Sequence, residues 1–424
     1  MKKLSILIAF LFLALTVCAQ ENTEYQKPPK EILDLVDAPL APSVLMDDAA
    51  ENVILLYRDA FKSIEELSET ELRLGGLRIN PKTNIGSRTN YYNNIKVKKA
   101  TDTKATQVTG LPENPRLSNF SWAPNQKYIA CLNTTTNGVE VWLLEIEKGA
   151  ARKITSPTVN ANMGDALNWF KNSDALLVKM LPESRKALIN VAEAVPTGPT
   201  ISVSDGAKAQ NRTYQDLLKN QNDEANFEQL ALSEVKKVGL NGDVQSFLPT
   251  GMYRNISFSP DGEYVLVSEI QRPFSYLVPY YRFPYTETVY FNNGTKLHTV
   301  NNVPLDEVRP KGFMATRTGM RNLSWRADKG ASLVYTEAQD GGDPEIKVAY
   351  RDIVYQLDAP FTGTPREILK TKNRFSGITW GDDDVAIAYD YWWNDRNTKT
   401  YLFSPNNTNE EAMIISDRNY QDRY

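Results

Sequence analysis

The segment "YRNISFSPDGEYVLVSEI" at residues 253–270 decides the fold, because its pattern recurs elsewhere in the chain. Each copy has a short polar strand that ends in an aromatic residue, a turn rich in Asp, Asn, Gly and Pro, and a β-branched run. The other copies are "LSNFSWAPNQKYIACLN" (117–133), "RNLSWRADKGASLVYTEA" (321–338) and "FSGITWGDDDVAIAYDYWW" (375–393). The repetition predicts one supersecondary unit that is used several times.

A second half follows several of these copies and consists of a strand, a turn and another strand. It is present in "GGLRINPKTN" (75–84), "VWLLEIEKGAARKIT" (141–155), "EVKKVGLNGDVQSF" (234–247) and "DIVYQLDAPFTGTPREI" (352–368). A unit of about four antiparallel strands every 40–50 residues is typical of an all-β protein, the β-propeller. The aromatic residues before the turns are expected to fill the space between neighbouring blades; they are Trp122, Trp169, Phe258, Trp325 and Trp380.

The repeats predict about six or seven blades in an incomplete ring over residues 43–424. Six blades can be assigned, near 43–97, 118–155, 164–200, 234–297, 320–370 and 375–415. Residues 212–232 break the strand pattern and are predicted to form a helical insertion inside a blade. Thr213 and Asp216 provide a Thr-x-x-Asp capping start for that helix.

The first residues of the chain resemble an export signal. Lys2 and Lys3 precede an apolar run, and small residues follow, so residues 1–19 are predicted to be a signal peptide and 20–42 an N-terminal segment. We therefore expect a periplasmic or secreted protein, with a lipid anchor at Cys18 as the less favoured alternative. The net charge of −4 and the lack of a basic run argue against a nucleic-acid partner.

Five phrases closely resemble the N-terminal part of the glutamyl endopeptidases, a branch of the prolyl-oligopeptidase family of serine peptidases. They are "YQKPPKEILDLVDAPLAPS" (25–43), "ELRLGGLRINPKTN" (71–84), "RTYQDLLKN" (212–220), "RPFSYLVPYYRFP" (272–284) and "DAPFTGTPREILKTKNRFSGITWGDDD" (358–384). The resemblance implies a propeller that gates a C-terminal α/β-hydrolase domain, in which a Ser-Asp-His triad cleaves proteins after glutamate.

The sequence departs from that family pattern at the catalytic residues. It contains no Gly-x-Ser-x-Gly nucleophile motif, and the nearest string, "GASLV" (330–334), belongs to a repeat strand. The single histidine, His298, lies in a polar segment that is read as an exposed loop, so a general base is also missing. We therefore expect the hydrolase domain to be absent and this chain to have no catalytic residues of its own.

Three residues, Tyr280, Tyr281 and Arg282, are the candidate substrate-binding site. They lie in a segment rich in aromatic residues and prolines, and a guanidinium could bind a glutamate side chain through two parallel hydrogen bonds. The alternative is that this segment only packs against a blade. The acidic clusters at 340–343 and 381–384 are interpreted as turns, Cys131 as a buried core residue, and no metal or cofactor is expected.

Three functions remain open at this point. The chain could be the substrate-gating propeller of a peptidase whose partners are a peptide substrate and a separately encoded α/β-hydrolase domain. It could instead be a stand-alone periplasmic propeller that binds a peptide or protein. It could also be a decayed peptidase fragment, in which case an open ring would expose blade edges and promote aggregation.

Overall fold

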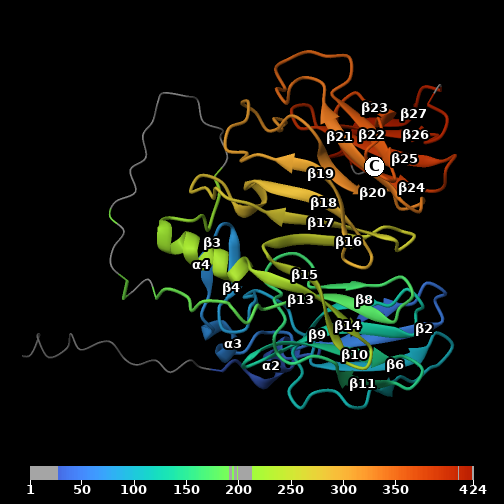
Figure 1. Cartoon of the computed structure of the whole chain (residues 1–424). Helices are drawn as coiled ribbons and strands as arrows, with labels where there is room; N and C mark the ends of the chain where they lie inside the picture. The colour runs from blue at the N-terminus through green and yellow to red at the C-terminus, as the bar shows by residue number, and fades with distance from the viewer. Residues whose placement is uncertain (1–26, 191–192, 195–197, 199–212, 409, 423–424) are drawn as a thin grey trace, which may run out of the picture.

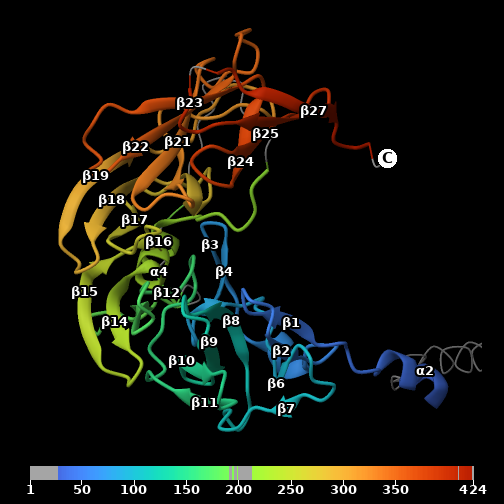
Figure 2. The ribbon, with the colours of Figure 1, turned by 90° about the vertical axis from the view of Figure 1, so that its right-hand side faces the viewer.

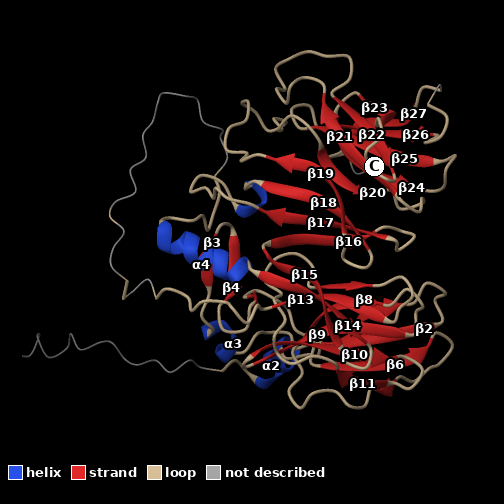
Figure 3. Cartoon of the chain, viewed as in Figure 1, coloured by secondary structure: helices blue, strands red, loops and turns tan. Residues whose placement is uncertain are grey.

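The computed structural model describes residues 27–190, 193–194, 198, 213–408 and 410–422, and β-strands dominate it (Figure 3). The predicted signal peptide, residues 1–19, lies outside the described residues. Two short helices near the start of the described chain are α2 (Lys30–Val36) and α3 (Ile64–Ser68). None of the helices in the described part is long and apolar enough to cross a membrane.

The strands form six four-stranded antiparallel sheets, each of which follows the order of the chain. The first three sheets are β1 (Ser43–Met46), β2 (Asn52–Tyr57), β6 (Asn94–Lys99) and β7 (Thr106–Gln107); β8 (Leu117–Trp122), β9 (Tyr128–Thr135), β10 (Gly138–Glu145) and β11 (Ala150–Lys153); and β12 (Leu167–Trp169), β13 (Ala175–Met180), β14 (Ser233–Gly239) and β15 (Val244–Gly251). The last three are β16 (Tyr253–Phe258), β17 (Tyr264–Ile270), β18 (Tyr285–Phe291) and β19 (Lys296–Val303); β20 (Arg321–Trp325), β21 (Ser332–Ala338), β22 (Asp352–Asp358) and β23 (Arg366–Thr371); and β24 (Arg374–Trp380), β25 (Ala386–Trp392), β26 (Asn397–Phe403) and β27 (Met413–Asn419).

These sheets are the blades of a β-propeller, as the repeats predicted. Figure 2 shows them side by side in an open arc, with the first sheet (blue) and the last (red) at its two ends. The first strand of a blade, such as β8, β16 or β24, lies on the inside of the arc, and the fourth lies outside. Because a single meander has two apolar faces, stacking the blades buries both of them.

The burial of the second strands shows this stacking directly. Every residue of β13, in the third blade, is buried. In the last blade, β25 alternates instead: Ala386, Ala388 and Asp390 are buried against the fifth blade, whereas Tyr389 and Tyr391 are exposed on the other face. Burial alternates with a period of two residues when only one face of a strand is packed. The face of the last sheet that points away from the fifth blade is therefore partly exposed to solvent.

The predicted role of the repeated aromatic residues is confirmed. Trp169 packs in a cluster with residues of the second blade, Trp325 with residues of the fourth, and Trp380 with residues of the fifth. Trp169 and Trp325 also donate their indole N–H groups across the interface, each at 3.1 Å, to the carbonyls of Ser121 and Ser257 in the preceding inner strands. Each of these aromatic side chains therefore joins its own blade to the one before it.

Trp122 offers a matched comparison, because its buried indole N–H has no partner in the structure. Trp169→Phe removes a hydrogen bond and leaves the Ser121 carbonyl unpaired, whereas Trp122→Phe removes an unsatisfied donor. We expect the first substitution to lower the free energy of unfolding by about 1 kcal/mol more than the second. Urea unfolding of both variants measures the difference in stability. Equal losses of stability would contradict a stabilising role for the hydrogen bond between Trp169 and Ser121.

Three details of the predicted organisation are wrong. The hairpin at 234–247 belongs to the third blade rather than the fourth, which spans Tyr253–Val303. Residues 75–84 lie outside the first blade, in a separate three-stranded sheet of β3 (Leu72–Leu74), β4 (Leu77–Asn80) and β5 (Ile85–Gly86). In the inserted segment, the helix α4 (Gln221–Ala231) is capped by the Asn220 side chain and not by Thr213, so it begins later than predicted.

Candidate functional site

One edge of the arc carries all of the long connections. In a four-stranded meander, the links between the second and third strands lie on the same edge as the links between successive blades. We call this edge the loop rim; its described residues are 58–93, 181–190, 193–194, 198, 213–232, 271–284 and 304–320. In Figure 1 it lies on the left, where α3, α4, β3 and β4 are labelled. The links on the opposite edge are shorter turns.

Three of these connections pack into one body that we call the cap: the small sheet β3–β5, helix α4 and the loop 271–284. Their apolar side chains share one buried cluster, in which Phe227 contacts the rings of Phe274 and Phe283 with centroid separations of 5.1 and 5.5 Å. Figure 2 shows β3, β4 and α4 near the middle of the arc, and Figure 1 shows them at one edge of the blades. The cap therefore lies at one edge of the arc, beside its middle blades.

Helix α4 is held at both ends by asparagine side chains. The Asn220 side chain accepts a hydrogen bond from the Asp223 backbone N–H at 2.9 Å, which satisfies a donor of the first turn. At the other end, Asn160 and Asn162 donate to the Leu230 carbonyl at 2.9 and 2.6 Å. Because these asparagines lie in the link between the second and third blades, the helix is fixed to the blades as well as capped.

The loop 271–284 is attached to the small sheet through a pair of glycines. Gly75 and Gly76 have φ values of +60° and +87°, and the Gly75 carbonyl accepts a hydrogen bond from the Tyr280 N–H at 2.7 Å. A Cβ atom at Gly76 would lie 2.7 Å from Cβ of Pro279. Only glycine combines this backbone conformation with so close an approach, so the two glycines set the position of the candidate site.

The predicted substrate-binding residues form the short 3₁₀ turn η1 (Tyr280–Arg282) in this loop. Tyr281 is about half exposed, whereas burial raises the pKa of the Tyr280 hydroxyl. Arg282 is buried, and its guanidinium donates to the Tyr214 hydroxyl and, at 3.1 Å, to Asp306. The structure thus brings the three residues together on the loop rim, but it pairs the guanidinium of Arg282 inside the protein.

A lysine that the sequence analysis did not single out is buried beside this site. Lys179 on β13 is 2% exposed, and its ammonium donates to the carbonyls of Met163 and, at 3.5 Å, Tyr253. Burial lowers the pKa of Lys179 to about 8, and the charge of Asp165 offsets part of this effect. The side chain joins the third blade to the start of the fourth.

This lowered pKa predicts a pH-dependent stability. Between pH 8 and 10.5 the unfolded chain holds a proton on Lys179 that the folded chain has released, so stability rises with pH in this window. The full contribution is on the order of 3 kcal/mol. We expect Lys179→Met to remove this rise, which the difference between wild-type and variant urea unfolding at pH 8 and pH 10 measures. Parallel pH profiles for the two proteins would contradict the prediction.

Arginines recur at the loop-rim end of the inner strands, a pattern that the sequence analysis missed. Arg116, Arg321 and Arg374 each lie at the start of an inner strand, and each forms an ion pair. Arg116 pairs with Glu69 at 2.9 Å, Arg321 with Asp352 at 2.6 Å, and Arg374 with Asp340 at 2.8 Å. A fourth, Arg254, is the second residue of β16.

The two acidic clusters are parts of ion-pair networks. In the cluster at 340–343, Asp340 binds Arg351 and Arg374 and accepts the Gly342 N–H. In the cluster at 381–384, Asp383 binds Arg326 and Lys329, while the Asp382 carboxylate accepts N–H groups of its own turn. The interpretation of both clusters as turns is consistent with these hydrogen bonds.

The loop rim also carries most of the strongly exposed apolar side chains among the described residues. Apart from Leu35 in the N-terminal helix α2, every described large apolar side chain that is more than 60% exposed lies there; these are Phe61, Ile64, Leu67, Leu277 and Val308. Ile64 and Val308 reach 87% and 91% exposure. Strongly exposed apolar side chains gathered on one face are typical of an interaction surface.

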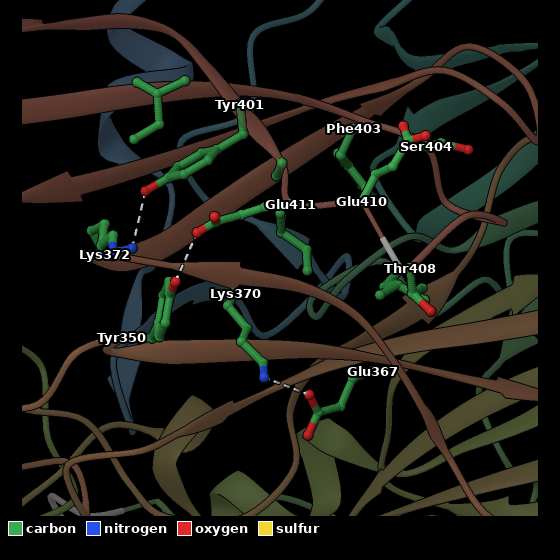
Figure 4. A pocket seen from close by; sticks show the side chains of 14 residues that line it. Tyr350, Glu367, Lys370, Lys372, Tyr401, Phe403, Ser404, Thr408, Glu410 and Glu411 are labelled. Carbon is green, nitrogen blue, oxygen red and sulfur yellow. Dashed lines mark hydrogen bonds and ion pairs between the residues drawn. The ribbon is translucent and has the colours of Figure 1, made fainter.

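The described pockets include one of about 460 Å³ between the fifth and sixth blades (Figure 4). Several of its polar side chains are paired with one another: the Tyr350 hydroxyl donates to Glu411 at 2.9 Å, and Lys370 binds Glu367 at 3.1 Å. Tyr401 accepts the Lys372 N–H at 2.9 Å. This pocket is a gap between the outer strands of two blades, and pairs of its own polar groups occupy part of its wall.

The residues considered for catalysis lie apart. His298 is in strand β19, on the outside of the arc, so its assignment to a loop is wrong. Ser332, in the string "GASLV", is buried in β21 and donates to Asp358 at 2.5 Å. Cys131 is buried in β9, as predicted, and burial raises the pKa of its thiol to about 12. The three side chains lie in different blades and do not form a triad.

Comparisons with known proteins give two close matches in sequence. The chain is 34% identical over 415 residues to a probable chloroplastic glutamyl endopeptidase of Oryza sativa, and 34% identical over 417 residues to one of Arabidopsis thaliana. These matches cover 94% and 95% of this chain but only 44% and 43% of the relatives. The chain thus spans less than half the length of these curated relatives.

Other comparisons are less informative. No protein-family profile matches the chain. Among solved structures, an acylaminoacyl peptidase of Pyrococcus horikoshii aligns with 90% of this chain and 47% of its own, at 13% identity and a TM-score of 0.44. The tricorn protease aligns with 90% of this chain and 32% of its own, at 9% identity and a TM-score of 0.43.

The resemblance that the five sequence phrases indicated is confirmed by the two plant proteins. Those phrases lie in the N-terminal segment, in and next to the cap, and in the last two blades. The resemblance therefore includes the connections on the loop rim as well as the blades. Over nearly its whole length the chain is similar to the glutamyl endopeptidases, and the part that it shares with them folds as β-propeller blades.

Proposed function

We propose that this chain is the substrate-gating propeller of an exported, glutamyl-endopeptidase-like serine peptidase, and that its loop rim docks an α/β-hydrolase domain. The apolar loop rim is the observation that carries the proposal. Apolar side chains that are exposed to water are unfavourable, and a partner that covers them stabilises the complex. The strongly exposed side chains on the loop rim include Ile64, Leu67, Leu277 and Val308. The relatives provide room for such a partner, because more than half of their length lies outside the match.

In this arrangement the two parts have separate tasks. The hydrolase domain supplies the nucleophile, the general base and the acid of the triad, as the family resemblance implies. The propeller limits access: the arc of blades and the cap surround the space in front of the docked domain, so a flexible peptide reaches the triad and a folded protein is held back. The chain's own contribution is binding and exclusion rather than bond cleavage.

The docking proposal is tested with the part of the rice relative that lies outside the matched stretch, produced as a separate protein. We expect it to bind this chain, and Val308→Asp or Ile64→Asp to weaken the binding at least about tenfold, because a buried charge replaces an apolar contact. Val244→Asp is the matched control, since Val244 is also exposed but lies on the opposite edge.

Isothermal titration calorimetry measures the three affinities. Absence of binding to the wild-type chain, or an equal loss with Val244→Asp, contradicts docking through the loop rim. A chain that binds peptides but no hydrolase domain would instead be a stand-alone binding propeller.

A further inference from the structure

Arg254 differs from the three arginines that share its place at the start of an inner strand. Each of those three pairs with a carboxylate of this chain. The guanidinium of Arg254 instead lies 3.8 Å from the ring centre of Tyr285 and donates one long hydrogen bond, at 3.4 Å, to the Tyr281 carbonyl. Among the described residues, no carboxylate forms an ion pair with it.

A second arginine without an ion pair contacts the same tyrosine. Arg317, in the link between the fourth and fifth blades, donates to the Tyr285 hydroxyl at 3.3 Å and to the backbone carbonyls of Thr318 and Met320. Within the described part of the chain it, too, has no carboxylate partner. Arg254 and Arg317 are both partly exposed residues, so neither is enclosed by the protein.

No ion pair within the described residues neutralises these two charges. An acidic group that interacts with both arginines is Glu287, which is buried and accepts hydrogen bonds from Ser268 at 3.2 Å and Asn301 at 2.8 Å. Burial raises the pKa of Glu287, and the two arginines offset only part of that effect.

The neighbouring ion-pair network is itself positive. It joins three arginines to two aspartates, which leaves one excess positive charge beside Arg317; its members are Arg321, Arg351, Arg374, Asp340 and Asp352. The arginine pair therefore lies in a local excess of positive charge.

We propose that Arg254 and Arg317 together bind a carboxylate side chain of a peptide at the loop-rim end of the inner strands. Two partly exposed arginines without carboxylate partners offer several N–H donors in the planar geometry that a carboxylate matches. They lie on an inner strand and a loop-rim link, beside the exposed Tyr281 of the cap, where a peptide would pass. This inference rests on the proposed gating function and specifies which residues select the peptide.

The arrangement also separates the role of Arg254 from that of Arg282. The guanidinium of Arg282 is buried and bound to Asp306 and Tyr214, and Arg309 binds the same aspartate. An incoming carboxylate would have to displace Asp306 to reach Arg282. Arg254 requires no such displacement, because none of the described carboxylates forms an ion pair with it.

The test uses the full chain and two fluorescein-labelled hexapeptides that differ only in a central glutamate or glutamine. Fluorescence anisotropy at about 50 mM salt, where screening is weak, gives both dissociation constants. We expect the glutamate peptide to bind about tenfold more tightly, which corresponds to 1.4 kcal/mol. Arg254→Gln and Arg317→Gln should each reduce this ratio to about twofold or less.

Arg272→Gln is the matched control, because Arg272 lies on the same rim but pairs with Glu224 and Glu228. It should leave the ratio unchanged. Arg254→Lys keeps the charge and loses the planar guanidinium, so it should keep part of the preference for glutamate. It also replaces Arg254→Gln in the test if the glutamine variant does not fold. A purely structural Arg254 would alter the affinity for both peptides equally and leave the ratio intact.

No preference for glutamate in the wild-type chain, or a preference that both arginine variants retain, overturns the proposal. Its failure is distinguishable from failure of the proposed function. Loss of the glutamate preference with intact docking of the hydrolase domain leaves the gating function in place. A preserved preference without docking supports the arginine site in a stand-alone binding propeller.

Discussion

Arg326→Met is expected to lower the free energy of unfolding by about 3–5 kcal/mol, one of the two largest effects that the structure predicts. Arg326 is fully buried and donates to Asp328 at 2.9 and 2.7 Å and to Gln356 at 2.8 Å. It also reaches Asp383 at 3.0 Å and lies 4.9 Å from the ring centre of Trp380 in the sixth blade. Methionine fills similar volume but leaves the buried carboxylate of Asp328 without its partner.

Lys329→Met provides the control, because Lys329 binds the same Asp383 at 2.9 Å from a partly exposed position. Screening by water makes such a pair weak, so we expect no measurable loss of stability. Urea unfolding monitored by tryptophan fluorescence compares the two variants. Equal effects would show that burial of Arg326 does not hold the fifth and sixth blades together.

Phe227→Ala is expected to cost about 3–5 kcal/mol of local stability in the cap. The ring is completely buried between Phe274 and Phe283, and Gly75 packs against its edge. Removing it leaves a cavity where the helix, the small sheet and the loop meet. The cap should open while the blades remain folded, since few blade residues belong to this cluster.

Hydrogen exchange locates this effect. The backbone N–H groups of Gly76 and Tyr280, which bond to Asp216 and Gly75, should exchange faster, whereas those of β9 and β10 should not change. Ile64→Ala is the control, because that side chain is 87% exposed and its removal leaves no cavity. Uniformly faster exchange across the chain would indicate that the cap is not a separate unit.

The blades were predictable because their signal is local. A polar strand, an aromatic residue, a tight turn and a β-branched run lie within about 20 residues, and each copy reinforces the others. The insertion in the third blade was harder to assign, because its hairpin at 234–247 pairs with β13 across residues 181–232. Sequence spacing alone favoured the next blade. Likewise, Asn220 caps α4 because tertiary packing fixes the helix start, although Thr213 matched the capping pattern.

The candidate site was only partly predictable. The aromatic and proline content of 272–284 pointed to Tyr280, Tyr281 and Arg282, but sequence cannot show that Asp306 and Tyr214 pair with Arg282 from distant segments. The arginines at the starts of inner strands were visible as Arg116, Arg254, Arg321 and Arg374, four or six residues before an aromatic. The repeated spacing shows that these arginines occupy the same place in each blade. It does not show which of them has a carboxylate partner, because the partners come from distant segments of the chain.

The most direct test of the gating function is a cleavage assay with the two parts mixed. The portion of the rice relative outside the match is incubated with a short glutamate-containing peptide and with a folded protein, in the presence and absence of this chain. We expect that adding the chain raises the initial rate of peptide cleavage and leaves the folded protein uncut. Cleavage rates of both substrates that do not change when the chain is added would contradict the gating role.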